Sequence, residues 1–243
     1  MYYNNSIIIL LYYSVYRKGL TMKFTDEALK RVNDEAEKLF EEIKNLEPIS
    51  ISKLDSKSCM AVFVDIINGF INEGAMASER VGDIIPSNVK LLKLCKENNI
   101  ITAAFADCHD KCAAEFASFP PHCIKGTGES EVVSELKDEG GYILIPKNST
   151  NGFNEQKFRD LLECHPKIDT FIVTGDCTDI CVMQFCLALK TYFTAADRQV
   201  KIIVPISCVE TYDAPFHSSD FANLAAYKLM KDSGIVFVKD VKE

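Results

Sequence analysis

Residues 170–181 read TFIVTGDCTDIC, and this stretch predicts a buried β-strand, a tight turn and a helix that begins near Cys181. Unsatisfied backbone N–H groups and the helix dipole favour negative charge at a helix N-terminus. A cysteine placed there is suited to act as a nucleophile if a base and a cation lie nearby. We therefore expect Cys181 to be a nucleophile whose thiolate is stabilised by the helix.

The rest of the chain continues this alternation of short apolar runs and amphipathic stretches. The runs predicted as strands cover residues 59–65, 100–105, 142–146, 170–174, 201–205 and 235–239. The stretches predicted as helices cover residues 86–99, 129–139, 154–164, 179–196 and 218–233. Apolar strands that alternate with helices are typical of a parallel sheet buried on both faces. The pattern predicts a three-layer α/β fold with a doubly wound parallel sheet of about six strands and helices on both faces.

Two other predicted strand ends carry residues that suit a reactive thiol. Asp65 ends the first run, and Lys147 follows the third. In open parallel sheets, ligands bind beyond the carboxyl ends of the strands. A buried lysine there needs a carboxylate or thiolate partner, although its long side chain could instead reach solvent. Together with Cys181, these residues predict a base, a cation and a nucleophile.

A second group of polar residues follows the run at 100–105. Asp107 and His109 come first, then Glu115, and then His122 directly after two prolines. Two of the four histidines in the chain therefore lie in this short segment. Carboxylates and imidazoles are good ligands for a divalent metal ion. The segment predicts a metal site formed by these four residues.

The same segment leaves one alternative open, a zinc site formed by the thiolates of Cys108, Cys112 and Cys123. Their spacing does not match the paired Cys-x-x-Cys arrangement of common zinc sites. The two remaining histidines, His165 and His217, are expected to be structural, because nothing in the sequence places either of them beside Cys181.

Composition narrows the class of protein. Of 243 residues, 47% are hydrophobic and 26% charged, which is ordinary for a soluble globular protein. A net charge of -8 argues against nucleic-acid binding. The ten cysteines lie within apolar patterns and show no regular spacing, which indicates a reducing, cytoplasmic compartment.

The first part of the chain is expected to lie outside the fold. The apolar run at 7–16 is too short to cross a bilayer, which takes about 20 residues. Arg17 and Lys18 follow this run, whereas a signal peptide has its positive charges before it. We expect residues 1–21 to be an extension, with a short membrane-associating segment as the alternative.

Residues 22–57 are expected to form an N-terminal helix and a linker, and residues 58–243 a single domain. The helix should run from about residue 25 to 45, with Thr25 as its cap, and its apolar residues fall on one face. Such a face would pack on the domain or on a partner subunit. We expect a homo-oligomer.

Taken together, these segments resemble the isochorismatase-like cysteine hydrolases, and among them the nicotinamidases. The resemblance spans residues 59–239. The family's Asp-Lys-Cys set matches Asp65, Lys147 and Cys181, and residues 175–181 match the signature around its nucleophile. The run FPPHC at 119–123 matches the metal motif of the nicotinamidases, which family members with other substrates generally lack.

The resemblance implies the isochorismatase-like hydrolase fold and the hydrolysis of nicotinamide to nicotinate and ammonia through a Cys181 thioester, feeding NAD salvage. It also implies one divalent metal ion, zinc, with iron or manganese as alternatives, and no organic cofactor. The partner is then a small-molecule amide, with neither nucleic acid nor a membrane involved. A cysteine amidohydrolase for another small amide or carbamoyl compound, or a non-catalytic metabolite-binding member, remains an alternative.

The resemblance further implies a cis peptide bond between Asp176 and Cys177, with the backbone N–H groups of Cys177 and Cys181 forming an oxyanion hole. Phe70 and Phe119 would form the walls around the substrate ring. Two departures leave the exact amide open. Gly69 stands where the family usually has aspartate, and Thr150 stands where some nicotinamidases have an aromatic residue.

Overall fold

The computed structural model describes residues 24–243, and these fall into two units that meet between Glu42 and Ile43 in the sequence. The described residues of the smaller unit are almost all in helix α2 (Asp26–Lys44), which ends two residues beyond that boundary. Thr25 caps this helix as predicted, because its Oγ1 accepts a hydrogen bond of 3.1 Å from the N–H of Ala28. The extension predicted at residues 1–21 lies outside the described residues. No helix within 24–243 has the length and apolar character needed to cross a membrane.

The larger unit contains a sheet of six parallel strands in the order β4-β3-β2-β5-β6-β7. These are β2 (Cys59–Val64), β3 (Ile101–Asp107), β4 (Ile143–Lys147), β5 (Thr170–Gly175), β6 (Lys201–Pro205) and β7 (Val236–Val238). Every strand lies within a residue or two of a predicted run, so the predicted α/β fold is confirmed. The strand order reverses at β2, which lies between β3 and β5.

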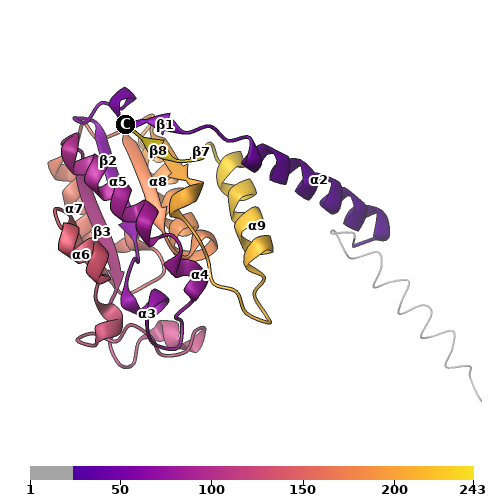
Figure 1. Cartoon of the computed structure of the whole chain (residues 1–243), viewed down its shortest axis with the longest axis horizontal. Coiled ribbons are helices and arrows are strands. Elements are labelled where there is room, and N and C mark those ends of the chain that lie inside the picture. The colour runs from indigo at the N-terminus through magenta and orange to yellow at the C-terminus, as the bar shows by residue number, and fades with distance from the viewer. Residues whose placement is uncertain (1–23) are drawn as a thin grey trace, which may run out of the picture. The chain divides into compact units, whose positions relative to one another are not determined.

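Helices cover both faces of this sheet (Figure 1). The longer ones are α5 (Ile85–Glu97), α6 (Ser134–Glu139), α7 (Gln156–Cys164), α8 (Met183–Ala195) and α9 (Ser219–Asp232). Every residue of β2 is buried, as expected for a central strand that packs on both sides. The edge strand β4 differs, because Ile143 and Leu144 are exposed.

The helix predicted at 129–139 forms only in its second half, as α6. The first half instead pairs with the segment after β2, where Ile67 and Val132 form an antiparallel bridge. Asn68, the first residue of the short helix α3 (Asn68–Ile71), donates its N–H to the carbonyl of Glu131 at 2.9 Å. This tertiary pairing satisfies backbone groups that a helix would have satisfied, and it overrides the helical pattern of the sequence.

Four very short α-helices and strands of the described residues were not predicted. They are the helices α3 and α4 (Glu79–Gly82) and the strands β1 (Ile49–Ser50) and β8 (Val241–Lys242), which pair in parallel. Elements of two to four residues are too short to show a periodicity in the sequence.

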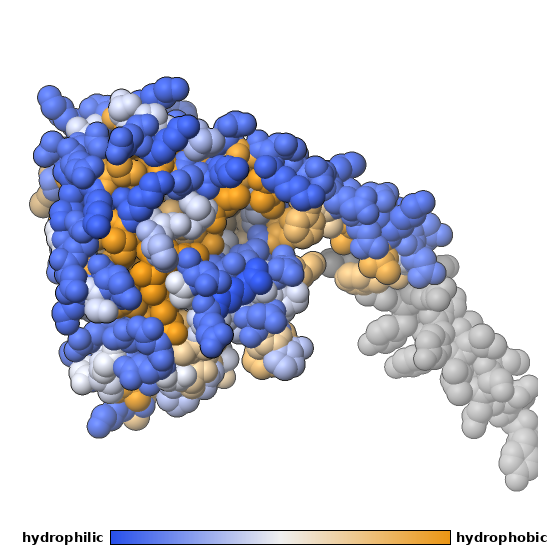
Figure 2. Space-filling model, viewed as in Figure 1, coloured by the Kyte–Doolittle hydropathy of each residue, from blue (hydrophilic) through white to orange (hydrophobic). Residues whose placement is uncertain are grey.

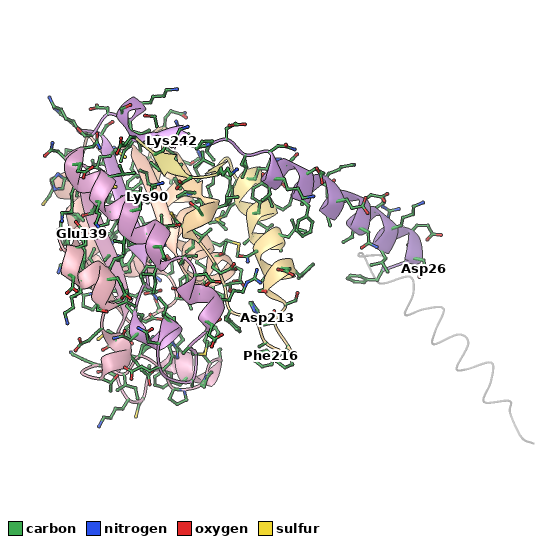
Figure 3. All side chains as sticks on the ribbon, in the orientation of Figure 1. Asp26, Lys90, Glu139, Asp213, Phe216 and Lys242 are labelled. Atoms are coloured by element: carbon green, nitrogen blue, oxygen red, sulfur yellow. The ribbon has the colours of Figure 1, made fainter. Side chains whose placement is uncertain are left out.

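Figure 2 shows an apolar strip along the face that carries α5, bordered by hydrophilic residues. Ile85, Val89 and Leu94 line a hollow there. Helix α5 is also held by ion pairs: Lys90 lies 2.8 Å from Asp240, near the C-terminus. Lys90 is labelled in Figure 3.

Candidate active site and metal site

The sheet brings the predicted site residues together at the carboxyl ends of four neighbouring strands. Asp107 and Lys147 are the last residues of β3 and β4, and they are paired in register. Strands β2 and β5 also end in register. Asp65 follows β2, and the turn that carries Cys181 follows β5. The site therefore lies where the strand order reverses, the usual position for a ligand site in such a sheet.

The ammonium group of Lys147 lies at the centre of these residues and is fully buried. Its Nζ lies 2.8 Å from Asp65 Oδ2 and donates a hydrogen bond of 2.5 Å to Asp107 Oδ1. It also donates to Cys181 Sγ at 3.7 Å. Burial opposes the positive charge, but Asp107, Asp65 and Cys181 raise the pKa of Lys147 well above its usual value. The alternative of a lysine that reaches solvent is wrong, and the residue stays a cation.

Asp65 is a buried carboxyl group with an unusual backbone conformation. Its φ of 56° is left-handed, a conformation that aspartate adopts more readily than most residues. Its Oδ1 accepts a hydrogen bond of 3.0 Å from the N–H of Asp107. Burial raises the pKa of Asp65 to about 7, although the charge of Lys147 lowers it. Such a carboxyl group can both take and return a proton near neutral pH.

Cys181 lies in a π-helical turn, Thr178–Val182, that precedes α8. Burial raises the pKa of the Cys181 thiol well above its usual value, and Lys147 opposes this while Asp65 and Asp107 add to it. Burial and the two carboxylates therefore favour the protonated form of the resting thiol. A carboxylate oxygen of Asp65 lies within 4.8 Å of Sγ and is placed to accept this proton.

The peptide bond between Asp176 and Cys177 is cis, which confirms what the resemblance implied. Gly175, just before it, has φ of 111°, and a Cβ there would lie 1.9 Å from the carbonyl oxygen of Val64. Only glycine fits where β5 passes so close to β2. Asp176 was not predicted to matter, yet it is fully buried and neither carboxylate oxygen has a hydrogen-bond partner among the described residues. Burial raises the pKa of Asp176 well above its usual value, which favours the neutral form of its carboxyl group.

The structure also brings together the four predicted metal ligands. Asp107, His109, Glu115 and His122 each place one ligand atom within 4.8 Å of the others. His109 Nε2 lies 3.5 Å from Asp107 Oδ1, and His122 Nε2 lies 3.8 Å from Glu115 Oε1. Burial opposes ionisation of Asp107, but Lys147 and both histidines hold its pKa well below the usual range. The carboxylate is therefore charged and able to bind a cation.

The histidine side chains are oriented as metal ligands usually are. The Nδ1 of His109 lies 3.1 Å from Asn148 Oδ1, and the Nδ1 of His122 lies 2.8 Å from the carbonyl oxygen of Pro120. Because both partners are acceptors, each Nδ1 carries the hydrogen and each Nε2 presents a lone pair to the centre of the cluster. The buried Nε2 of His109 has no hydrogen-bond partner among residues 24–243. These residues fit a divalent metal ion.

The alternative thiolate zinc site finds no support in the structure. Within the described part of the chain, no cluster of potential metal ligands includes Cys108, Cys112 or Cys123.

A small pocket connects the thiol with the metal cluster. Its lining residues are Phe70, Met76, Asp107, Glu115, Phe119, His122, Thr150, Cys177, Ile180 and Cys181. Phe70 and Phe119 were predicted to wall the substrate, and their ring centroids lie 5.6 and 6.3 Å from that of His122. Met76 and Ile180 were not predicted, because a lone apolar residue in a loop or turn carries no signal.

Comparison with known proteins finds similarity along most of the chain. The family model for the isochorismatase domain matches residues 59–231. Nicotinamidase 1 of Arabidopsis thaliana is 30% identical over 230 residues, which cover 84% of this chain and 93% of that protein.

Solved structures show the same fold at lower identity. N-carbamoylsarcosine amidase from Thermoplasma acidophilum is 22% identical with a TM-score of 0.63, and the match covers 75% of this chain and 96% of that one. The pyrazinamidase of Pyrococcus horikoshii in complex with zinc is 21% identical with a TM-score of 0.62, covering 75% of this chain and 99% of that one.

Proposed function

The chain belongs to the isochorismatase family, and from this premise we propose that it is a cysteine amidohydrolase that converts nicotinamide to nicotinate and ammonia. The observation that carries the proposal is one pocket lined by both Cys181 and the metal cluster. The similarity to Nicotinamidase 1 of Arabidopsis thaliana supports the same substrate. The nicotinate formed would feed NAD salvage.

The reaction begins with the resting thiol. Asp65 takes the proton of Cys181 as Sγ attacks the amide carbon, and Lys147 stabilises the charge on sulfur from 3.7 Å. The carbonyl oxygen becomes an oxyanion. The backbone N–H groups of Cys177 and Cys181 are its proposed donors.

Asp65 then acts as an acid. It returns the proton to the amide nitrogen, the C–N bond breaks, ammonia leaves, and the acyl group remains on Cys181 as a thioester. In the second half, Asp65 accepts a proton from water as the water oxygen attacks the thioester. The C–S bond breaks, the proton returns to sulfur, and the acid is released. A pKa of about 7 suits Asp65 to both directions of transfer.

The metal site would orient the substrate. Asp107, His109 and His122 would hold the cation, with Glu115 binding directly or through water. When bound, the cation supplies a Lewis acid for the pyridine nitrogen, and its role is positioning. Two imidazoles with carboxylates suit zinc, and the zinc complex of the Pyrococcus horikoshii pyrazinamidase supports this choice, while iron and manganese also fit the donor set.

The pocket between the aromatic walls Phe70 and Phe119 is small, which suits a compact amide. A carbamoyl compound is the second candidate, because the fold is shared with N-carbamoylsarcosine amidase. Nicotinamide is favoured because a cation beside the thiol is best explained by a ligand nitrogen that it can bind.

Comparison of nicotinamide with benzamide tests the proposal, because benzamide lacks only the ring nitrogen. We expect kcat/KM for benzamide to be lower by about 10²-fold or more, since a site built around a polar partner rejects an analogue without it. Ammonia release gives both rates, and a carbamoylated amine serves as the third substrate. Equal rates on nicotinamide and benzamide, or a preference for the carbamoyl compound, would contradict the proposal.

Replacing a metal ligand should separate binding from thiol chemistry. We expect His122→Ala to reduce the bound metal measured by elemental analysis and to raise KM for nicotinamide by about tenfold or more. Iodoacetamide should still label Cys181, because Asp65 and Lys147 are unchanged. His165→Ala is the matched control and should resemble wild type. Full activity in a protein without bound metal would argue against the role of the cation.

A further inference from the structure

The carboxylate of Asp179, two residues before Cys181, is held on both oxygens. Thr211 Oγ1 donates a hydrogen bond of 2.7 Å to Asp179 Oδ1, and His217 Nε2 lies 2.9 Å from Asp179 Oδ2. The side chains of His217 and Asp179 are only 17% and 16% exposed. Both partners come from residues 206–218, the segment between β6 and α9. His217, which we expected to be structural because nothing in the sequence places it beside Cys181, therefore contacts the turn that carries the thiol.

His217 is itself fixed on several sides. Its Nδ1 lies 3.0 Å from the carbonyl oxygen of Tyr212, and its ring stacks on that of Tyr212 with centroids 4.0 Å apart. Its backbone exchanges two hydrogen bonds of 2.9 Å with Ala214. The surrounding loop includes Asp213 and Phe216, which are labelled in Figure 3. Because both ring nitrogens face acceptors, the imidazole cannot turn without losing a partner.

The same segment is also tied to the backbone at the start of the nucleophile turn and just before it. Thr178 donates its N–H to the carbonyl of Glu210 at 3.0 Å, and Glu210 donates its own to the carbonyl of Gly175 at 3.4 Å. The carboxylate of Glu210 in turn lies 3.1 Å from Arg80 Nε. The segment is therefore a fixed support against which the turn is held.

We propose that Asp179, Thr211 and His217 form a clamp that positions the nucleophile turn for catalysis. A single π-helical turn has few hydrogen bonds of its own to fix its geometry. The clamp keeps Cys181 Sγ and the N–H groups of Cys177 and Cys181 in alignment with the reacting carbonyl. None of its three members lines the pocket, so they are positioning residues. This role rests on the proposed thioester mechanism.

Kinetics of His217 variants test the clamp. In His217→Ala we expect kcat to fall by about tenfold to a hundredfold, because small misplacements of reacting groups are costly. KM should stay within about threefold, since the pocket walls and metal ligands are unchanged. In His217→Gln the side-chain amide can still donate to Asp179, so kcat should return to within about threefold of wild type. His165→Ala should have no effect. A kcat for His217→Ala within about twofold of wild type, or no rescue by glutamine, would overturn the clamp.

The effects of replacing Asp179 and His217 on kcat should also be coupled. Asp179→Ala and His217→Ala remove the same contact, so the double variant should be no slower than the slower single variant. Independent, multiplicative losses would show that the two residues act separately and would overturn the proposal.

Hydrogen exchange tests the clamp without any substrate. Peptide amides of residues 177–182 should exchange faster in His217→Ala than in wild type, and His165→Ala should match wild type. Melting temperatures of the variants show whether the change is local. If the wild-type protein does not hydrolyse nicotinamide, the proposed function is wrong, but the exchange measurement still tests the clamp because it needs no substrate. Unchanged exchange at 177–182 in His217→Ala would refute the clamp.

Discussion

Cys181→Ser should lower turnover of nicotinamide by about 10⁴-fold or more. The serine hydroxyl is far less acidic than a thiol, and Asp65 cannot remove its proton at a useful rate. Burial makes this worse, because a buried alkoxide has only Lys147 to stabilise it. The exchange of sulfur for oxygen is small, so the fold and its melting temperature should be retained.

Ammonia release and peptide mapping after iodoacetamide treatment measure this effect. Wild type should be labelled at Cys181, and Cys181→Ser should lose this label together with its activity. The exposed Cys164 provides the matched control, since Cys164→Ser changes the same atom far from the pocket. Loss of activity in Cys123→Ser with activity retained in Cys181→Ser would show that the nucleophile is misassigned.

The strands of the fold were predictable because burial on both faces leaves a continuous apolar run in the sequence. All six predicted strands are present. Their order was not predictable, since it depends on pairings between distant segments. The contact of Lys147 with Asp107 illustrates this, because it follows from the register of β3 and β4.

The residue types of the site were visible in the sequence, but their electrostatics were not. The protonation of Cys181 depends on burial and on the nearby charges of Asp65 and Asp107, which only the folded chain brings together. The contact between His217 and Asp179 has the same origin, because no local pattern relates the two residues. The catalytic residue types that a local motif specifies can thus be predicted from the sequence, whereas a contact with a residue of a distant loop cannot.

Asp65→Asn should lower turnover by about 10³-fold to 10⁴-fold, because it removes the group that moves every proton in the reaction. Lys147→Met should also be severely impaired, and the double variant should be little worse than either single variant. Iodoacetamide should label Cys181 more slowly in both variants. Unchanged labelling would mean that neither residue influences the thiol.

Asp176→Asn is the matched control for Asp65→Asn. Both aspartates are fully buried, and each directly follows one of two neighbouring strands, β2 or β5. Only Asp65 forms an ion pair with Lys147. Because burial favours the neutral form of the Asp176 carboxyl group, a neutral amide of the same shape should preserve most of the activity. Equal losses in the two variants would contradict the distinction between a base and a neutral acid.

The same control variant should differ from wild type in its response to pH. In the unfolded chain the carboxyl group of Asp176 has a pKa of about 3.9. In the folded protein burial raises this pKa, so unfolding releases a proton at pH values between the unfolded and the folded pKa, and wild type loses stability as pH rises through that range. Asparagine has no such proton. The melting temperature of Asp176→Asn relative to wild type should therefore increase between about pH 4.5 and pH 7.5, and a constant difference would show that the buried carboxyl group is charged.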